Sequence, residues 1–489
     1  MSLRPLAAID ADASFEAGAR FLEEAVQFLA ESAGGDVAVS PSTDPEALAA
    51  RLAEPLPRHG APLAGILERI RRDVIAESIR LTHPMYLGHQ VSAPLPAGIW
   101  TDMIASAVNN SLAVREMSPA GTVLEAQVVR WMCELAGFGG ESGGTFTSGG
   151  TEATFTALLA ARAVALPEAW AHGVGADPPL IVCGEHAHYA VSRAAGELGL
   201  GTKQVVRVPS RDFRMDVAGL EHALERLTAE GRRVMAVVAT AGSTATGSFD
   251  DLATIAGVCE SRGIWVHVDA AHGASALLSP RHRHRLRGIE RADSIAWDPH
   301  KMMLLPLSAG MVLVRRETDL EAAFAQQAPY LFHGSGGRRW DQGIRSFQCS
   351  RRFDALKVWV ALQRYGADGI AELHDLLCER ARQLHAAVVA HPAFEAVHEP
   401  ESNIVCFRFV GGASGAGGAS GGEPLEELNR RLRESYNRSG EGWITLTVLD
   451  GRPVLRVTVM NPRTAPEHLD RLLEGLAREG ERLLADGTA

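Results

Sequence analysis

The sequence predicts an α/β protein with a large domain built on a mostly parallel sheet and a smaller α/β domain toward the C-terminus. Two observations support this fold class. Short, continuously apolar runs alternate with helical patterns, which is typical of parallel strands covered by helices on both faces. The chain is also too long for one compact core. The apolar runs lie at 180–183, 234–239, 264–268 and 311–314, and the helical patterns at about 188–199, 216–230 and 251–262.

The composition is that of an ordinary soluble globular protein. Of 489 residues, 22% are charged and 46% are hydrophobic, and the formal net charge of -11 argues against a nucleic-acid-binding surface. We expect an N-terminal helical arm at 1–95, a large domain at 96–370 and a small C-terminal domain at 371–489.

The cysteines and the N-terminus indicate where the protein works. Six cysteines are scattered without CxxC spacing, so we predict no metal site, no disulfide framework and a reducing compartment. Acidic residues near the N-terminus argue against a signal peptide, and no apolar run approaches the length of a membrane span. We therefore expect a cytoplasmic protein without nucleic-acid or membrane partners. The basic stretch Arg281 to Arg287 is interpreted as a solvated loop or an interface patch rather than a metal or nucleic-acid site.

The N-terminal part is predicted to be helical. Periodic apolar residues indicate helices at about 13–32, 62–80, 97–113 and 121–135, with a linker rich in Gly, Ser and Pro at 33–45. The first helix carries an apolar stripe made of Phe15, Phe21, Leu22, Val26 and Leu29. This arm either packs against a second subunit or caps its own domain, and the sequence leaves both interpretations open.

A glycine turn between a strand and a helix predicts a seat for an anion. The segment Gly143 to Ala153 contains a strand, a Gly-Gly turn and a helix that begins near Thr151. Exposed N–H groups and the positive end of the helix dipole suit such a turn to a phosphate group. It is neither a Walker A loop nor a GxGxxG fingerprint. A capped helix without a ligand would give the same pattern, so both interpretations stay open.

Three further side chains follow predicted strands of the same sheet. His188 comes after the run at 180–183, Asp269 ends the run at 264–268, and Lys301 follows a β-branched, apolar stretch ending near Trp297. Ligands of such sheets bind at the carboxyl ends of the strands. A lysine able to form a Schiff base, a carboxylate that keeps a pyridine nitrogen protonated and a flat imidazole together suit pyridoxal 5'-phosphate (PLP). Each signal alone also fits an ordinary structural residue.

Several short motifs match one known family. They are Thr-Ser-Gly-Gly-Thr-Glu-Ala at 147–153, His-Val-Asp-Ala-Ala at 267–271, Asp-Pro-His-Lys-Met-Met at 298–303, Tyr-Leu-Phe at 330–332, Phe-Gln-Cys-Ser-Arg-Arg at 347–352, Asp-Ala-Leu-Lys-Val-Trp at 354–359, and Val-Leu-Arg-Val at 454–457 with Asn461-Pro462. Through them the chain resembles the group II PLP-dependent amino-acid decarboxylases, which include the aromatic L-amino-acid, histidine, glutamate and cysteine-sulfinate decarboxylases. The resemblance covers about residues 80 to 475. One departure is Asp298, where the family usually has Asn.

The resemblance implies an architecture and a cofactor. We expect a fold-type I (aspartate-aminotransferase-like) large domain, PLP, and an obligate homodimer with active sites at the subunit interface. Lys301 would hold the cofactor aldehyde and Asp269 would pair with the pyridine nitrogen. His188 would stack on the ring, with Ala271 closing the opposite face.

The same resemblance implies further contacts. Gly150 and Thr151 would hold the phosphate, and Thr244 would lie near the ring substituents. His300 would reach the phosphate or the substrate. The remaining implied residues are Ser350, on a segment that approaches the other subunit's cofactor, and Arg456, near the α-carboxylate of the substrate.

The reaction is predicted to be decarboxylation of an L-amino acid to the amine and carbon dioxide. Tyr330 lies in a glycine-containing segment and would protonate the α-carbon, since a phenol is an acid suited to a strongly basic carbanion. The alternatives are another PLP reaction on the same scaffold (aldehyde synthase, C–C lyase or aminotransferase) and a non-catalytic PLP-binding protein.

The substrate side chain is left open by the sequence. The segments expected to line its pocket contain His89, Gln90 and Arg115, which suit an acidic or polar side chain, and Tyr86, which suits an aromatic one. Arg115 could equally pair with a neighbouring carboxylate. Gly411 to Gly422 is predicted to be a flexible surface loop between a strand at 403–410 and a helix near 424–436.

Overall fold

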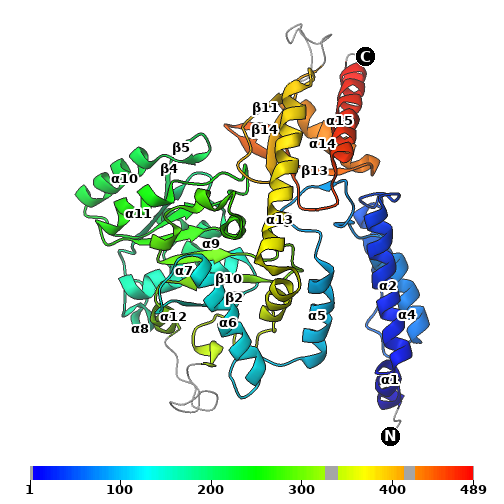
Figure 1. Cartoon of the computed structure of the whole chain (residues 1–489), viewed down its shortest axis with the longest axis horizontal. Coiled ribbons are helices and arrows are strands. Elements are labelled where there is room, and N and C mark those ends of the chain that lie inside the picture. The colour runs from blue at the N-terminus through cyan, green and yellow to red at the C-terminus, as the bar shows by residue number, and fades with distance from the viewer. Residues whose placement is uncertain (1–3, 325–339, 412–424, 488–489) are drawn as a thin grey trace. The chain divides into compact units, whose positions relative to one another are not determined.

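The structure is a computed structural model that describes residues 4–324, 340–411 and 425–487 (Figure 1). The chain forms two compact units. The first contains Met1–His89, Ala386–Val397 and Phe407–Ala489, and the second contains Gln90–His385 and His398–Cys406. Among the described helices, none is long and apolar enough to cross a membrane.

A seven-stranded sheet forms the centre of the second unit, with the strand order β2-β10-β9-β8-β7-β3-β4. Neighbouring strands from β9 to β4 run parallel, whereas β10 is antiparallel to both β2 and β9. The prediction of a mostly parallel sheet is therefore confirmed. The strands are β2 (Gly143–Thr147), β3 (Leu180–Gly184), β4 (Val205–Val208), β7 (Val234–Thr240), β8 (Trp265–Asp269), β9 (Ser294–Trp297) and β10 (Gly310–Val314).

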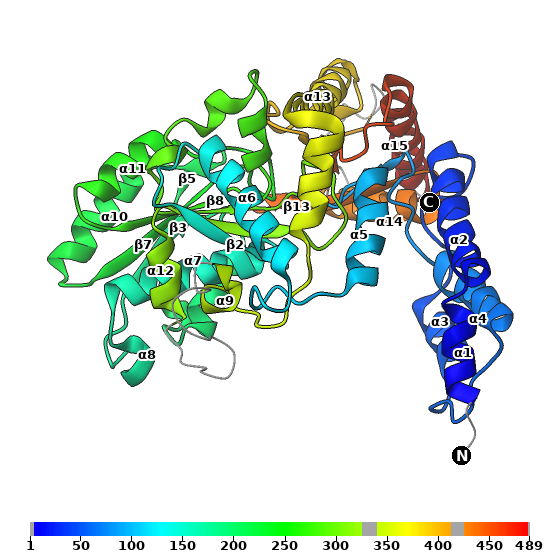
Figure 2. The same cartoon turned by 60° about the horizontal axis from the view of Figure 1, so that its bottom comes forward.

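Helices cover both faces of this sheet, which explains why its strands are apolar throughout. In Figure 2, α7 (Gly150–Ala165), α9 (Ala190–Glu197) and α12 (Glu317–Ala323) lie on one face, and α10 (Val217–Ala229) and α11 (Leu252–Glu260) lie on the other. Every residue of β2, β3, β8, β9 and β10 is buried. A strand buried on both faces has no solvent side on which to place alternating polar residues.

The remaining helices of the second unit follow local signals in the sequence. Pro119 occupies the first turn of α6, where a missing N–H costs nothing. The long helix α13 is interrupted at Gly366, whose φ of 72° lies in the left-handed region that glycine tolerates. We had assigned no helix to that stretch. These elements are α5 (Pro96–Val108), α6 (Pro119–Leu135), α8 (Ala169–His172) and α13 (Ala355–Ala390), with the short hairpin β5 (Ser210–Arg211) and β6 (Arg214–Met215).

The first unit contains N-terminal helices and a five-stranded sheet of order β1-β13-β14-β12-β11. The helix predicted at 62–80 is α4 followed by one π-helical stretch, Ile70–Ile75. The predicted loop beyond Gly411 falls almost wholly outside the described residues. The elements are α1 (Arg4–Asp12), α2 (Phe15–Gly34), α3 (Pro45–Leu52), α4 (Leu63–Arg69), α14 (Leu425–Ser439), α15 (Pro466–Gly487), β1 (Tyr86–Leu87), β11 (Phe394–Ala396), β12 (Ile404–Phe409), β13 (Trp443–Leu449) and β14 (Arg452–Thr458).

Candidate active site

A cavity of about 300 Å³ lies in the second unit at the carboxyl ends of the sheet strands. Its volume is at the lower end of the range for small-molecule sites. Eight residues selected from the sequence line it: Gly150, Thr151, His188, Thr244, Asp269, Ala271, His300 and Lys301. These residues come from five separate segments of the sequence, and the fold brings them to one cavity.

The parallel strands explain this convergence. Asp269 ends β8 and lies in register with Thr240 at the end of β7 and Ala296 near the end of β9. The backbone N–H of Asp298 donates to the carbonyl of Ala271 at 3.1 Å, which ties together the two turns that leave β8 and β9. Parallel neighbours end at the same edge, so the residues that follow them must meet there.

Lys301 is held next to a buried carboxylate. Its Nζ lies 3.2 Å from Oδ2 of Asp298, whose side chain is 1% exposed. The same oxygen accepts a hydrogen bond from the backbone N–H of Gly150 at 3.0 Å and lies 3.5 Å from Nε2 of His300. The other oxygen of Asp298, Oδ1, is buried and has no hydrogen-bond partner. Asp298, which stands where the family usually has Asn, thus places a carboxylate directly at the glycine turn.

The glycine turn is built for close approach of the backbone. A Cβ on Gly150 would lie 2.9 Å from Cβ of Ala271 and 3.1 Å from Oδ2 of Asp298. The turn is fixed from outside by Glu152, which accepts hydrogen bonds from the N–H and hydroxyl of Ser148 at 2.9 and 2.7 Å. Gly150 is the first residue of a 16-residue helix, so its N–H lies at the positive end of the helix dipole.

The two predicted histidines of the cavity are held in defined orientations. Nδ1 of His188 accepts from the N–H of Ala190 at 3.3 Å, and Nδ1 of His300 accepts from the N–H of Ala309 at 3.0 Å. Burial lowers the pKa of His188 below its ordinary value, although Asp269 partly opposes this. Burial also lowers the pKa of His300, against the opposing charge of Asp298. Both imidazoles are therefore neutral at pH 7, which suits a ring that stacks on a cofactor.

Sequence reasoning did not select His272, which also lines the cavity. Its Nε2 lies 2.7 Å from Oδ1 of Asn403, a residue far away in the chain. The signal that could have found it is its position three residues after Asp269, still in the turn that leaves β8. Asp269 itself accepts from the N–H of Ala271 at 3.3 Å, which leaves its second oxygen for a ligand.

Lys301 is also singled out by the scarcity of lysine. The 489 residues contain only three lysines, Lys203, Lys301 and Lys357. Lys203 is exposed in a short 3-10 turn outside the cavity. Lys357 is fully buried and is bound by Oδ1 of Asp354 at 2.9 Å and the carbonyl of Ser308 at 2.5 Å. Among these lysines only Lys301 combines access to the cavity with a position at a strand end.

Other predicted residues lie elsewhere. Ser350 is exposed and does not line the cavity, and Arg115 is exposed, with its backbone N–H donating to Oδ1 of Asp341 at 3.0 Å. Nε2 of Gln90 is buried without a hydrogen bond. Tyr330 falls outside the described residues.

Three predicted substrate residues belong to the first unit. The Tyr86 ring stacks on Trp443 with centroids 5.4 Å apart, and the His89 ring lies 5.2 Å from the same indole. Nε of Arg456 donates to Oγ1 of Thr445 at 3.0 Å.

The residues of the cavity fit PLP. A glycine turn at a helix N-terminus offers N–H donors for a phosphate, Asp269 has a free acceptor for a pyridine N–H, and Lys301 has the amine that an aldehyde requires. Oδ1 of Asp298 is buried without a hydrogen-bond partner, which also indicates that the polar groups of this cavity are arranged to bind a ligand.

The comparison with known families agrees with this chemistry. Residues 45–410 match the pyridoxal-dependent decarboxylase conserved domain. The chain belongs to the pyridoxal-dependent decarboxylase family. It is therefore a PLP-dependent amino-acid decarboxylase, a carboxy-lyase, as the sequence motifs predicted.

Individual relatives support the assignment along nearly the whole chain. The protein is 33% identical over 436 residues to the L-2,4-diaminobutyrate decarboxylase of Rhizobium meliloti (strain 1021), covering 88% of this chain and 84% of that protein. It is 34% identical over 449 residues to the cysteine sulfinic acid decarboxylase of Rattus norvegicus, covering 90% of each. The crystal structure of mouse CSAD in apo form superposes with a TM-score of 0.89 at 31% identity, covering 96% of this chain and 99% of that one.

Proposed function

We propose that Lys301, Asp269 and His188 are the central residues of the decarboxylation site. When bound, PLP supplies an electron sink for the pair of electrons released as carbon dioxide departs. Lys301 would hold the cofactor through its amine and would release it to the amino group of the substrate. Asp269 keeps the pyridine nitrogen protonated, His188 covers one ring face, and Ala271 covers the other. The observation that carries this proposal is that one cavity gathers all of these residues.

The phosphate is proposed to bind at the glycine turn. Gly150 and Thr151 provide N–H and hydroxyl donors, each charge-assisted bond contributing roughly 1.5–3 kcal/mol. Thr244 and His300 line the same cavity and complete the polar surface. Ser350 is proposed as a contact to the partner subunit's cofactor, which is consistent with its exposure within a single chain.

Tyr330 is proposed as the acid that protonates the α-carbon after carbon dioxide leaves. Protonation at the α-carbon gives the amine, whereas failure to deliver this proton allows carbonyl products to form. Tyr330→Phe should still bind PLP as purified, but its amine yield should fall sharply. Aldehyde should rise, formed either together with pyridoxamine phosphate or, with dissolved O₂ as the oxidant, together with ammonia and hydrogen peroxide. An unchanged amine yield would remove Tyr330 from the mechanism.

For the substrate, we propose an amino acid with an acidic side chain. In the first unit the segment that ends at His89 lies in a positive field. Partial burial lowers the pKa of His89, and the charges of Arg456 and Arg433 lower it further. The guanidinium of Arg433 also lies over the Trp443 ring at 5.5 Å. Such a field attracts a carboxylate or sulfinate and repels the second ammonium group of a diamino acid. The similarity to a cysteine sulfinic acid decarboxylase supports an acidic substrate. The similarity to an L-2,4-diaminobutyrate decarboxylase supports the competing class, a diamino acid.

A substrate screen tests this proposal. Carbon dioxide release would be measured with cysteine sulfinate, aspartate, glutamate, 2,4-diaminobutyrate, ornithine and dopa. We expect an acidic substrate to give the highest kcat/KM, and Arg433→Gln to raise its KM more than Arg438→Gln, an exposed control on the same helix. A clear preference for diaminobutyrate, or for dopa, would overturn the acidic assignment.

The protein is further proposed to be a cytoplasmic homodimer with active sites at the interface. Its N-terminal helices leave large apolar side chains in solvent within a single chain: Leu6, Ile9, Phe15, Phe21, Leu22 and Val26 are each between 41% and 93% exposed. A second copy of this chain is the proposed occupant, because an obligate dimer buries such surface. Light scattering that gave a fully active monomer would contradict it. The six cysteines, none of them in a disulfide and five of them buried, support a reducing compartment.

A further inference from the structure

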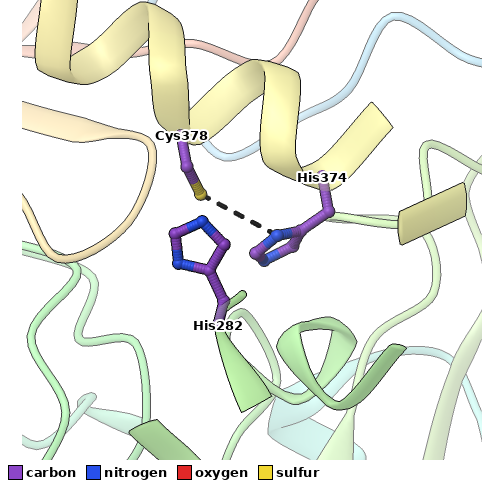
Figure 3. Close-up of side chains that lie close together, drawn as sticks. All are labelled: His282, His374 and Cys378. Atoms are coloured by element: carbon purple, nitrogen blue, oxygen red, sulfur yellow. Dashed lines mark hydrogen bonds between the residues drawn. The ribbon is translucent and has the colours of Figure 1, made fainter. Parts of the chain in front are cut away.

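A second cluster of chemically active side chains lies in the second unit, away from the residues that line the cavity. His282, His374 and Cys378 converge there (Figure 3). They are 4%, 3% and 1% exposed. His374 and Cys378 are four residues apart on α13 and therefore share one face of that helix. His282 comes from the basic stretch Arg281 to Arg287, which the sequence analysis interpreted as a solvated loop or an interface patch, yet its side chain is buried.

The spacing of the three donors suits a tetrahedral metal ion. One donor atom from each residue lies within 4.8 Å of the other two. Sγ of Cys378 lies 3.9 Å from Nδ1 of His374. Zinc with bonds of about 2.3 Å to sulfur and about 2.05 Å to nitrogen would place such atoms about 3.5 Å apart. Small side-chain movements would close the difference.

His282 carries an independent sign of a missing ligand. Neither of its ring nitrogens has a hydrogen-bond partner, although the side chain is almost completely buried. Buried polar groups are normally satisfied, so each exception needs an explanation. In Figure 3 the imidazole of His282 points toward the sulfur of Cys378 and the ring of His374. A metal ion between the three would satisfy it.

The surroundings supply a balancing negative charge. Oδ1 of Asp375 lies 3.7 Å from Nε2 of His282 and 3.7 Å from Nδ1 of His374, and it accepts a hydrogen bond from Oγ of Ser279 at 2.5 Å. A divalent ion bound to one thiolate keeps a net positive charge, which this carboxylate would neutralise. Three arginines nearby, Arg281, Arg285 and Arg382, oppose a cation, but Arg281 and Arg382 are themselves within 4 Å of Glu379.

We propose that His282, His374 and Cys378 bind one Zn²⁺ ion, with Asp375 as the adjacent counter-charge. Two imidazoles and a thiolate select zinc over the oxygen-loving Mg²⁺ and Ca²⁺. In the balanced reaction Zn²⁺ enters, the thiol proton of Cys378 leaves to solvent, and the ligands are two neutral imidazoles and one thiolate. No electron is transferred.

The proposed role is structural. His282 follows the 3-10 turn Ala274–Leu278, and this turn begins directly after His272 and Gly273. A metal that joins His282 to α13 thus anchors the segment that leaves β8, which carries Asp269, Ala271 and His272 into the cavity. His282 is 92 residues from His374 in sequence (374 − 282), and the site uses a single cysteine, which is why the cysteine spacing indicated no metal site.

The first test uses the full-length holoenzyme. Metal content is measured after dialysis against Zn²⁺, and Co²⁺ is then exchanged into the chelator-stripped protein. We expect about one Zn²⁺ per chain, and Co²⁺ ligand-field bands at the red end of the visible spectrum, clear of the cofactor absorption. Cys378→Ser should abolish both, whereas Cys259→Ser, a control at another buried cysteine, should keep both.

Two further measurements guard against a variant that fails to fold. His282→Gln changes a ligand outside α13 and should also lose the Co²⁺ bands. Calorimetric titration of stripped wild-type protein with Zn²⁺, in buffers of different ionisation enthalpy, should show release of about one proton per ion bound. The proposal is overturned if stripped wild-type protein binds no stoichiometric Zn²⁺ or Co²⁺, or if it binds them without a tetrahedral thiolate spectrum. In that case the three side chains form a buried cluster that needs no ion.

Discussion

The pairs Arg351–Glu125 and Lys301–Asp298 are two contacts between a cation and a carboxylate in the second unit, and they differ in how completely the carboxylate oxygens are hydrogen-bonded. Arg351 donates to both oxygens of Glu125 at 2.8 and 2.7 Å, with side-chain exposures of 4% and 0%. Lys301 contacts one oxygen of Asp298 at 3.2 Å, and the other oxygen of Asp298 has no hydrogen-bond partner.

This difference in hydrogen bonding distinguishes a pair that stabilises the fold from a pair that is available to a ligand. A bidentate guanidinium–carboxylate pair satisfies both carboxylate oxygens and fixes its geometry. Arg351 and Glu125 therefore hold the segment before α13 against α6. Both oxygens of Glu125 are occupied, while the buried Nε of Arg351 has no hydrogen-bond partner among the described residues. Around Lys301 the hydrogen-bond donors and acceptors do not match in number. Oδ2 of Asp298 contacts three groups, the N–H of Gly150, Nε2 of His300 and Nζ of Lys301, whereas Oδ1 contacts none of them. A buried polar atom without a hydrogen-bond partner lowers the stability of the folded protein. Such atoms are therefore found mainly where a bound ligand supplies the missing partner.

The largest effect is expected at Lys301. Lys301→Ala should abolish turnover and the visible absorption band of lysine-bound PLP, because neither of the other two lysines lies in the cavity. Absorbance, borohydride reduction and carbon dioxide release would be measured together. Lys203→Ala, at an exposed lysine, is the matched control and should behave as wild type. A borohydride-reducible PLP adduct remaining in Lys301→Ala would show that the lysine has been assigned wrongly.

Arg351 should have the largest effect on stability. Arg351→Ala leaves a fully buried Glu125 without its partner, which costs about 3–5 kcal/mol. Urea denaturation would measure this loss. The neighbouring Arg352 pairs with Asp102 at 2.7 Å but is 53% exposed, so Arg352→Ala should cost less than about 1 kcal/mol. Equal losses in the two variants would contradict the distinction between a satisfied buried pair and a surface pair.

His267 lies between these two cases, because only one of its two ring nitrogens has a hydrogen-bond partner. Nδ1 lies 2.9 Å from Oγ of Ser294, while the buried Nε2 has no hydrogen-bond partner. Burial lowers the pKa of His267 to about 4, compared with 6.5 when unfolded. The unfolded chain then binds more protons between those values, so stability is present above pH 6.5 and is lost as the pH falls toward 4.

This loss amounts to at most about 3 kcal/mol for His267. The free energy of unfolding of His267→Gln should depend less steeply on pH over the same range. Burial also lowers the pKa of His282, and the contribution of His282 to the pH dependence should be the same in both proteins. Denaturation of both proteins at several pH values would measure the difference. Parallel pH profiles would show that His267 is not the titrating group.

The smallest effect is expected at Asp298. Asp298→Asn removes a negative charge beside the proposed phosphate turn and frees Lys301 from its counter-ion. We expect the Kd for PLP, measured by equilibrium dialysis of the apoenzyme, to fall about five-fold, which corresponds to about 1 kcal/mol. Asp293→Asn, just before the opposite end of β9, should leave the Kd unchanged. Weaker PLP binding in Asp298→Asn would show that the carboxylate supports the cofactor site.

The sequence by itself was sufficient for several buried strands of the large sheet and for eight of the cavity residues. Apolar runs such as 264–268 are short-range signals, and they identify buried strands without knowledge of their neighbours. Once the sheet is parallel, chain direction places Asp269, Lys301 and His188 at the same edge. These predictions depend only on local pattern and on one topological rule.

The tertiary structure decided what depends on contacts between distant segments. No local pattern indicates that Asp298 would bond to Gly150, that His272 would meet Asn403, or that His282 would face His374 and Cys378. The interruption of α13 at Gly366 was equally hidden, because a glycine inside a helical pattern permits a break without requiring one. Hydrophobic periodicity specifies which face of an element is buried, but side-chain packing between elements selects the polar partners found there.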